Sequence, residues 1–253
     1  MNYVKILDVR IDNVNKKQVL ETVADFLQSD KQNKIFTPNP EMLVDARKDQ
    51  YFKEILNSGD LNICDGKGLE IASRGQLKRI PGVDLMLDIC ELAEKENKSI
   101  YLLGSGSDEV VKKTAEVLQE KFPLLKIVGH SMGPSITTEQ HNNRTTLVYN
   151  KDKNEDLMYD IITSAPDILF VAFGHGKQEK WIEENLIDLP SVKVAMGVGG
   201  SFDFISGKTK RAPVWMRKIG LEWLYRLVRE PKRVGRIFKA TFVFLSLSRK
   251  YTK

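Results

Sequence analysis

The sequence has few of the residues that form disulfides, metal clusters or redox centres. Its 253 residues include only two cysteines and three histidines, and no His/Cys group has the spacing of a metal site. Cys64 and Cys90 stand in apolar surroundings, which indicates reduced core thiols of a cytosolic protein. No two aspartates stand at i, i+2, so the Asp-x-Asp metal clamp of many nucleotide-sugar enzymes is missing. These absences favour chemistry that needs no metal and no other cofactor.

Long hydrophobic runs are also missing. The N-terminal residues contain no apolar stretch of the kind found in signal peptides. The longest apolar run near the C-terminus, residues 240–248, is far shorter than the roughly 20 residues needed to span a bilayer. We therefore expect a cytoplasmic protein that does not cross a membrane.

Charge is unevenly distributed along the chain. The formal net charge is +5, but residues 208–253 carry 14 lysines and arginines against two acids, Glu222 and Glu230. The remaining residues are therefore slightly acidic. A basic segment on an acidic body indicates an anionic partner, which could be phosphate, nucleic acid or an anionic bilayer.

Short β-branched runs alternate with longer amphipathic runs through residue 206, which predicts βαβ units and a mostly parallel, Rossmann-like sheet with helices on both faces. The expected strands are residues 3–11, 34–39, 61–65, 99–105, 125–131, 167–174 and 192–200. The expected helices are residues 16–28, 40–56, 82–96, 107–122 and 177–187. Gly207 and Pro213 favour a boundary between an α/β catalytic body, residues 1–206, and a basic helical appendage, residues 207–253.

Ligands of parallel sheets bind beyond the carboxyl ends of the strands, so the residues after each strand are the candidates for chemistry. Asp65 follows one strand and precedes two glycines, so it is either a general base or a turn aspartate. Thr37 and Asn39 follow another strand. Asn39 could be the N-cap of the next helix, but that role leaves Thr37 unexplained.

Glycine-rich segments follow three further strands. Gly104, Ser105 and Gly106 form either an anion site or an ordinary tight turn, because the third glycine of a dinucleotide fingerprint is absent. That absence argues against an NAD-dependent enzyme. Gly199 and Gly200 would also let a ligand approach the backbone.

The segment after the strand at 167–174 reads Gly174-His175-Gly176-Lys177-Gln178-Glu179. Lys177 could meet a phosphate, Gln178 could hydrogen-bond a sugar or base, and Glu179 suits a first helical turn. His175 invites a catalytic interpretation, but a single loop histidine is more often solvated.

Several blocks in order, TPNPEM, CDGKGLE, RIPGVDLM, YLLGSGSDEV, FGHGKQEKW, GVGGSFDFISGKTKRAP and GLEWLYRLVREPKRVGR, closely resemble the WecG/TagA/CpsF glycosyltransferases, glycosyltransferase family 26. The resemblance covers nearly the whole chain and is closest to the TagA branch. The chain departs from the family's G-x-P-x-Q-E pattern, since Gly176 stands where the family usually has proline.

The resemblance implies an inverting transfer of N-acetylmannosamine from a UDP-sugar donor to an undecaprenyl-diphosphate-linked GlcNAc acceptor, a step in the synthesis of wall teichoic acid. The related WecG branch uses the corresponding uronic acid, which remains the alternative donor sugar. The family's proposed base corresponds to Asp65, and Thr37, Asn39 and Gln178 correspond to sugar-site residues. We also assign Arg79, Lys177 and Glu179 to substrate binding. The glycine segments 104–106 and 199–200, Ser105 included, are assigned to the nucleotide diphosphate.

The basic appendage interleaves cations with apolar residues at helical spacing, among them Trp223. The pattern favours an interfacial helix or a helix docked on the body over nucleic-acid binding. We expect it to hold the protein on the anionic inner face of the cell membrane and to complete the active site there. The residues assigned to the lipid diphosphate and membrane are Arg211, Arg217, Trp223, Arg226, Arg229 and Arg233. A homo-oligomer remains open.

Overall fold

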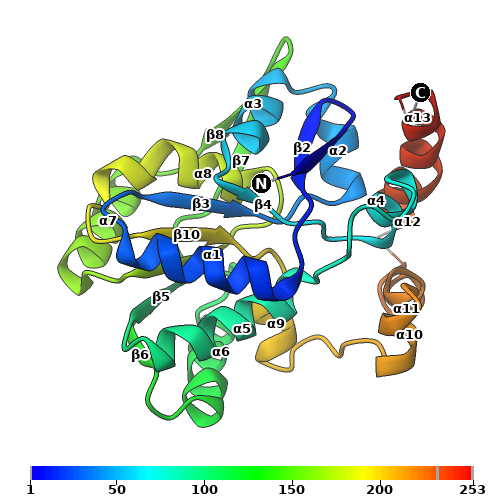
Figure 1. The fold of residues 1–253 in the computed structure, drawn as a ribbon. Helices are drawn as coiled ribbons and strands as arrows, with labels where there is room; N and C mark the ends of the chain where they lie inside the picture. The colour runs from blue at the N-terminus through cyan, green and yellow to red at the C-terminus, as the bar shows by residue number, and fades with distance from the viewer. Residues whose placement is uncertain (1, 232–233, 252–253) are drawn as a thin grey trace.

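The computed structural model describes residues 2–231 and 234–251, and its centre is a six-stranded parallel sheet (Figure 1). The strand order is β4-β3-β10-β9-β5-β6, and each neighbouring pair is parallel. The strands are β3 (Asn33–Phe36), β4 (Leu61–Asn62), β5 (Ser99–Gly104), β6 (Lys126–Ser131), β9 (Ile168–Ala172) and β10 (Val194–Gly197). The predicted α/β class with a mostly parallel sheet is confirmed.

Helices cover both faces of this sheet. Successive strand residues point to opposite sides and are apolar, so each face packs against helices. On one face, Ile100, Leu102 and Phe170 pack against helices of one cluster. That cluster draws on α1 (Lys16–Gln28), α5 (Gly82–Lys95), α6 (Asp108–Lys121) and α9 (Ser201–Ile205). On the other face, Tyr101 and Leu103 belong to a cluster with α2 (Pro40–Ala46), α3 (Gln50–Ser58), α7 (Lys151–Ser164) and α8 (Lys177–Asn185). Residues 186–188 continue α8 as the 3-10 turn η1 (Leu186–Asp188).

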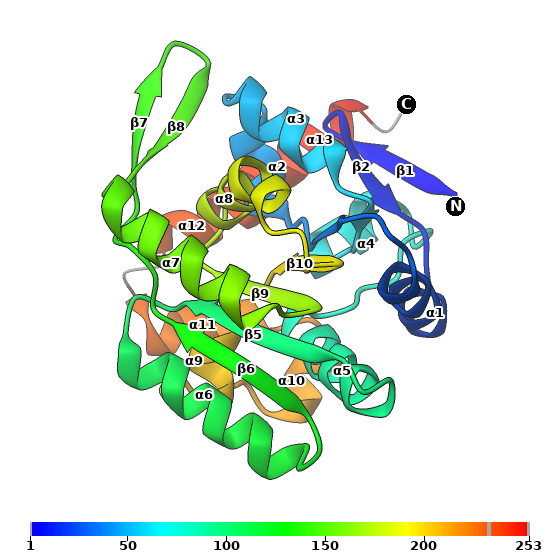
Figure 2. The ribbon, with the colours of Figure 1, turned by 90° about the vertical axis from the view of Figure 1, so that its left-hand side faces the viewer.

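Two antiparallel hairpins lie outside the central sheet. The predicted single strand at 3–11 is instead a hairpin of β1 (Tyr3–Ile6) and β2 (Val9–Asp12), because Leu7 and Asp8 turn the chain with φ of 50° and 65°. The hairpin of β7 (Thr137–His141) and β8 (Arg144–Val148) was not predicted and projects from the body in Figure 2.

The predicted helix at 40–56 is two helices, α2 and α3. Asp49 starts the second helix, since its side chain accepts a hydrogen bond from the backbone N–H of Phe52 at 3.1 Å. The carboxylate of Asp49 also accepts from the buried Lys180 of α8 at 2.6 Å. The interruption therefore places an acid where a buried lysine needs a partner.

The C-terminal segment forms a column of helices along one flank of the body (Figure 1). It comprises α10 (Val214–Lys218), α11 (Glu222–Arg229), α12 (Val234–Phe238), the π-helical segment η3 (Lys239–Val243) and α13 (Phe244–Tyr251). Gly220, with φ of +81°, separates α10 from α11, so the apolar spacing seen in the sequence spans two helices.

The end of the C-terminal segment packs into the body. The side chain of Phe244 is fully buried and belongs to the same core cluster as α2 and α3. Gly68, in α4 (Lys67–Ala72), lies beside the Phe244 ring, and glycine there allows α4 to approach α2, since a Cβ would lie 2.8 Å from Pro40 Cγ. The boundary near residue 206 stays a prediction, and these contacts cross it. Within the described residues no helix is both long enough and apolar enough to span a bilayer.

Candidate active site

A cleft of about 970 Å³ runs along the carboxyl ends of the parallel strands. Segments that follow all six strands of the sheet contribute to its wall, as expected for ligand sites of parallel sheets. The predicted site residues that line it are Thr37, Asn39, Asp65, Arg79, Ser105, Gly106, Lys177, Gln178, Gly199, Gly200, Trp223 and Arg226. The fold thus brings together residues that lie as far apart as 37 and 226 in the sequence.

Asp65 lies in this cleft at the N-terminus of α5. Its backbone N–H donates to the carbonyl oxygen of Pro38 at 3.0 Å, and its carboxylate accepts a hydrogen bond from the backbone N–H of Gly82. Both polar groups lie next to Gly82, since a Cβ on it would be 3.4 Å from Thr37 Oγ1 and 3.6 Å from Asp65 Oδ2. The β3 and β4 ends therefore place a hydroxyl and a carboxylate around one helix terminus.

Burial raises the pKa of Asp65 to about 6, against an ordinary value of 3.8. Arg79, the N–H of Gly82 and Arg226 act in the opposite direction, while Glu222 raises the pKa further. At neutral pH roughly nine in ten of these carboxylates are ionised, and each is a stronger base than an exposed aspartate. These properties fit the general-base role predicted for Asp65, which stays a prediction.

Arg79 and Glu222 join the body to the C-terminal segment beside Asp65. Arg79 donates to Glu222 Oε2 at 2.9 Å and to the carbonyl oxygen of Arg217 at 3.1 Å. Arg211 donates to Asp84 at 2.5 Å and lies 3.6 Å from the other oxygen of Glu222. Arg79 and Arg211, which we assigned to substrate and lipid, thus also dock the C-terminal segment next to the candidate base.

Hydrogen bonds join the start of α8 to the glycine turn after β10. Gln178 accepts from the backbone N–H of Gly199 at 2.9 Å and donates to Glu179 at 2.8 Å. Glu179 is fully buried and accepts from the backbone N–H of Gly176 at 2.6 Å, so its carboxylate lies behind the cleft wall. Lys177 Nζ donates to the carbonyl oxygen of Ile136 at 2.7 Å. Gln178 therefore fixes the glycine turn after β10 as well as lining the cleft.

The turn after β5 consists of three residues with positive φ: Gly104 at 114°, Ser105 at 73° and Gly106 at 67°. Gly104 is buried, and a Cβ there would lie 2.7 Å from the backbone of Ala172, so close strand packing requires glycine. Ser105 holds a left-handed conformation that is uncommon for a residue with a side chain. Ser105 and Gly106 face the cleft, and Gly104 shapes the turn behind them.

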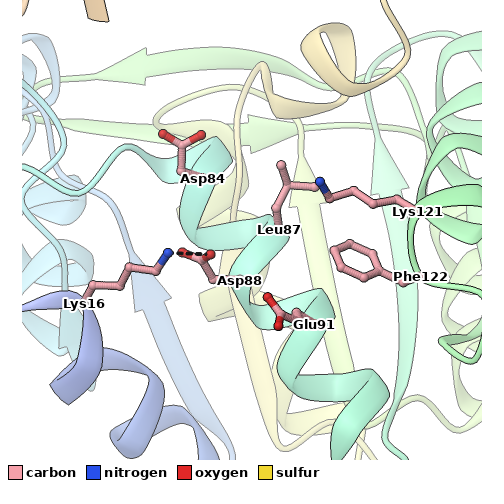
Figure 3. A pocket seen from close by; sticks show the side chains of 7 residues that line it. All are labelled: Lys16, Asp84, Leu87, Asp88, Glu91, Lys121 and Phe122. Atoms are coloured by element: carbon pink, nitrogen blue, oxygen red, sulfur yellow. Dashed lines mark ion pairs between the residues drawn. The ribbon is translucent and has the colours of Figure 1, made fainter. Parts of the chain in front are cut away.

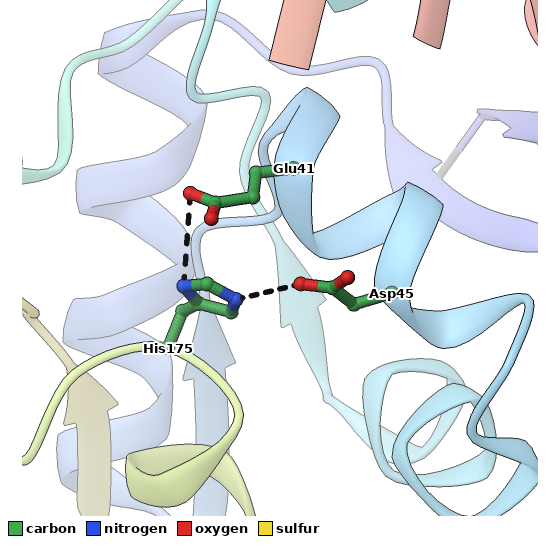
Figure 4. Close-up of side chains that lie close together, drawn as sticks. All are labelled: Glu41, Asp45 and His175. Atoms are coloured by element: carbon green, nitrogen blue, oxygen red, sulfur yellow. Dashed lines mark hydrogen bonds and ion pairs between the residues drawn. The ribbon is translucent and has the colours of Figure 1, made fainter. Parts of the chain in front are cut away.

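Sequence reasoning missed a cluster of charged groups at the cleft rim (Figure 4). His175 Nε2 lies 3.0 Å from Asp45, and His175 Nδ1 lies 3.9 Å from Glu41. From the C-terminal segment, Arg236 donates to both oxygens of Glu41 at 2.9 Å and Lys239 donates to Asp45 at 2.8 Å. The two cations compensate the carboxylates, so the cluster fastens α12 and η3 to α2 and is not an open set of metal ligands.

The pKa of Asp45 shows that the cations of this cluster stabilise its ionised carboxylates. Burial alone would raise its pKa, but hydrogen bonds from His175 and Lys239 hold the pKa below its ordinary value. Arg236 and Lys239 stand 195 and 194 residues from their acidic partners, and no local sequence pattern signals such a pairing. The basic composition of residues 208–253 was the only available sign of it.

A second depression, of about 480 Å³, lies between α1, α5 and α6 (Figure 3). Its lining mixes Lys16, Asp84 and Asp88 with Leu87 and Phe122. Lys16 and Asp88 already form an ion pair at 2.7 Å, and the lining of the depression contains none of the residues that follow the strands of the sheet. The cleft is therefore the better candidate for chemistry.

Comparison with known proteins identifies the family. The sequence profile described as "Glycosyl transferase WecG/TagA/CpsF family" matches residues 4–253. The chain belongs to the WecG/TagA/CpsF glycosyltransferase family. Relatives from Staphylococcus aureus strains MW2, NCTC 8325 / PS 47 and COL are each 33% identical over 241 residues, covering 92% of this chain and 87% of the relative. Each is named N-acetylglucosaminyldiphosphoundecaprenol N-acetyl-beta-D-mannosaminyltransferase. The predicted membership is confirmed, and the protein is a glycosyltransferase.

Within this glycosyltransferase, the residues assigned to the lipid occupy different places. Trp223 and Arg226 line the cleft, and the guanidinium of Arg226 lies 4.5 Å from the centre of the Phe204 ring. Arg217 donates to the carbonyl oxygen of Ala212, and Arg229 lies 5.6 Å from the centre of the Tyr225 ring. Arg233 lies outside the described residues. The catalytic and binding roles of all these residues stay predictions.

Proposed function

We propose that this glycosyltransferase moves N-acetylmannosamine from UDP-N-acetylmannosamine to undecaprenyl-diphosphate-linked GlcNAc with inversion, as a step in wall teichoic acid synthesis. The observation that carries the proposal is the environment of Asp65. A carboxylate with a pKa of about 6 lies in the cleft where every strand of the sheet ends. The relatives' printed name supplies the two sugars and the lipid.

The proposed step is a single displacement at the anomeric carbon. The acceptor hydroxyl oxygen forms a bond to that carbon, its proton passes to Asp65, and the bond to the UDP oxygen breaks. UDP leaves with developing negative charge, which Lys177, Arg226 and the backbone N–H group of Gly106 in the cleft wall would offset. This arrangement supports a reaction that does not depend on a metal.

Charges around Asp65 favour the neutral sugar over the uronic acid. Glu222 contributes a second negative charge near Asp65, and Arg79 is already bonded to Glu222 and to the backbone of Arg217. Arg226 also acts on Asp65, but the proposed step uses it for the leaving diphosphate, so a uronic acid carboxylate would meet Asp65 and Glu222 with both arginines committed. N-acetylmannosamine carries no such charge.

Membrane attachment through the C-terminal segment is part of the proposal. The side chains of Trp215, Val228 and Phe238 are 62%, 77% and 56% exposed on the flank formed by α10 to α13. The same segment carries the surface cations Lys218 and Arg229. Aromatic and aliphatic side chains among cations suit the interface of an anionic bilayer, where the acceptor lipid is anchored. The inner face of the cell membrane is the proposed location.

The test is a donor comparison with the full chain. A short-chain lipid-diphosphate-GlcNAc is supplied with UDP-N-acetylmannosamine or with its uronic acid counterpart, each with and without EDTA. We expect rapid turnover of the first donor, unchanged by EDTA. Faster turnover of the uronic acid would reverse the assigned sugar, and a rate lost to EDTA and restored by a divalent cation would refute metal independence.

A further inference from the structure

The cleft changes character along its length. Near β5, β9 and β10 its wall includes polar and glycine residues, as Ser105, Lys177 and Gly199 illustrate, together with apolar ones such as Phe173 and Val198. Beside α4 and the C-terminal segment apolar side chains predominate, although Lys67 and Thr241 also line this part. The residues of this part, here called the apolar groove, are Ile71, Ile237, Ala240, Phe242 and Leu245. Figure 1 shows α4 next to α12 and α13, on the flank away from β5 and β6.

The walls of the apolar groove are held in place by packing and ion pairs. Phe244, which separates Phe242 from Leu245 along the chain, is fully buried against Gly68 of α4. The ion pairs of Arg236 with Glu41 and of Lys239 with Asp45 fasten α12 and η3 to α2. The groove is therefore formed before any ligand arrives.

Large apolar side chains in the groove remain exposed. Ile71 is 57% exposed and Phe242 is 69% exposed, so both would gain from contact with a hydrocarbon. The five side chains of the groove offer no charge and present aliphatic and aromatic surface to an occupant, while Lys67 and Thr241 add polar atoms beside them. A branched hydrocarbon chain without polar atoms matches this surface.

The groove continues into the part of the cleft that holds cations and the candidate base. Arg236 directly precedes Ile237 of the groove, lines the same cleft and is half exposed. Arg226 and Asp65 lie in that cleft as well. A ligand that joins a diphosphate to a hydrocarbon would therefore meet cations with one end and the groove with the other.

We propose that the apolar groove binds the first isoprene units of the lipid on the acceptor. The protein then recognises the start of the lipid chain directly, in addition to any contact with the bilayer. This inference rests on the proposed function, because that function supplies a prenyl diphosphate as substrate.

The test uses soluble acceptors, so that no bilayer contributes. GlcNAc-diphosphate esters that carry a methyl group, an unbranched alkyl chain or a farnesyl chain are compared below their micelle concentrations. We expect the KM of the wild-type protein to be at least about tenfold lower for the farnesyl ester than for the methyl ester, because a hydrophobic pocket gains affinity with each buried carbon. The branched chain should also be preferred to the unbranched one.

Ile71→Glu is the decisive variant, since an exposed side chain can be changed without disturbing the core. It should raise the KM for the farnesyl ester about tenfold and leave the KM values for the methyl ester and for UDP-N-acetylmannosamine unchanged. Ile187→Glu, at a 76% exposed position of η1, is the matched control and should change none of them.

Calorimetry with farnesyl diphosphate and inorganic diphosphate gives a readout that does not need turnover. Tighter binding of the farnesyl compound, weakened in Ile71→Glu, is expected. Equal affinities for farnesyl diphosphate and inorganic diphosphate, or equal KM values for the methyl and farnesyl esters, would refute isoprene binding in the apolar groove. The proposed sugar transfer would be unaffected. Failure of every ester to react would instead count against the proposed function. The calorimetric comparison would then still test whether the apolar groove binds the isoprene chain.

Discussion

Asp65→Asn should abolish most of the turnover and at the same time raise the stability of the fold at neutral pH. The folded-state pKa of Asp65 is about 6, against 3.8 ordinarily, a difference of about two units. Each unit corresponds to about 1.4 kcal/mol, so the ionised carboxylate destabilises the folded state by up to about 3 kcal/mol. Asparagine removes that charge and still offers an oxygen to the N–H of Gly82.

The pH dependence of this effect has a definite sign. A carboxyl group whose folded pKa is raised causes no destabilisation below its unfolded pKa near 4, and the full destabilisation appears above about 6. The melting temperature of Asp65→Asn should therefore exceed that of the wild type at pH 7.5 by several degrees and match it at pH 4. Asp188→Asn, at an exposed position, is the control and should show no difference at either pH.

The turnover of Asp65→Asn should fall, although its stability at neutral pH rises. Loss of a general base lowers kcat by about 10²- to 10⁴-fold, and kcat/KM of the wild type should rise with pH through about 6. Initial rates with UDP-N-acetylmannosamine and a short-chain acceptor, measured beside the melting curves, test both parts. Near-wild-type turnover of Asp65→Asn would remove Asp65 from the mechanism. Equal melting temperatures at pH 7.5 would refute the destabilisation of the fold by the ionised carboxylate.

Three further substitutions test the surroundings of Asp65 and the C-terminal segment. Glu222→Gln should move the acidic limb of the kcat/KM profile below pH 6, because Glu222 raises the pKa of Asp65; an unmoved limb would contradict that coupling. Trp215→Glu should weaken flotation with anionic vesicles and leave turnover of soluble acceptors unchanged, whereas full flotation would leave Trp215 out of the membrane surface. Arg236→Gln should lower stability by about 1 kcal/mol, since it leaves the buried Glu41 with one partner fewer, and an unchanged melting curve would show that this ion pair contributes nothing.

The sheet and the positions of many cleft-lining residues could be predicted from the sequence because each depends on local signals. Residues 16–28 show helical periodicity, and α1 has these same bounds. The polar residue after a buried strand marks the cleft, as Asp65 and Lys177 show. Asn39 caps α2 as expected, with its side chain accepting from the N–H of Met42 at 3.0 Å.

The roles of the C-terminal cations could not be predicted, because their partners are distant in the sequence. Arg211 pairs with Asp84, and Arg236 pairs with Glu41, across more than 120 residues. The break between α10 and α11 depends on Gly220, where a Cβ would lie 2.8 Å from the side chain of Lys67. Tertiary contacts of this kind produce no periodic pattern in the sequence from which they could be predicted.

The paired cations also bear on the nucleic-acid alternative. Arg211, Arg236 and Lys239 of the basic segment each contact a carboxylate of the body, so part of the basic charge serves internal docking. Binding to nucleic acid depends on cations that are free to meet phosphates. The arrangement therefore favours an enzyme whose C-terminal segment closes over its own cleft.

The stereochemistry of the product tests the central claim most directly. The full chain is incubated with UDP-N-acetylmannosamine and the farnesyl-diphosphate-GlcNAc acceptor, and the anomeric configuration of the new glycosidic bond is determined by NMR. The α-linked donor and a single displacement with Asp65 as base predict a disaccharide with only the β-linked sugar. An α-linked product, or none with this donor, would contradict the account.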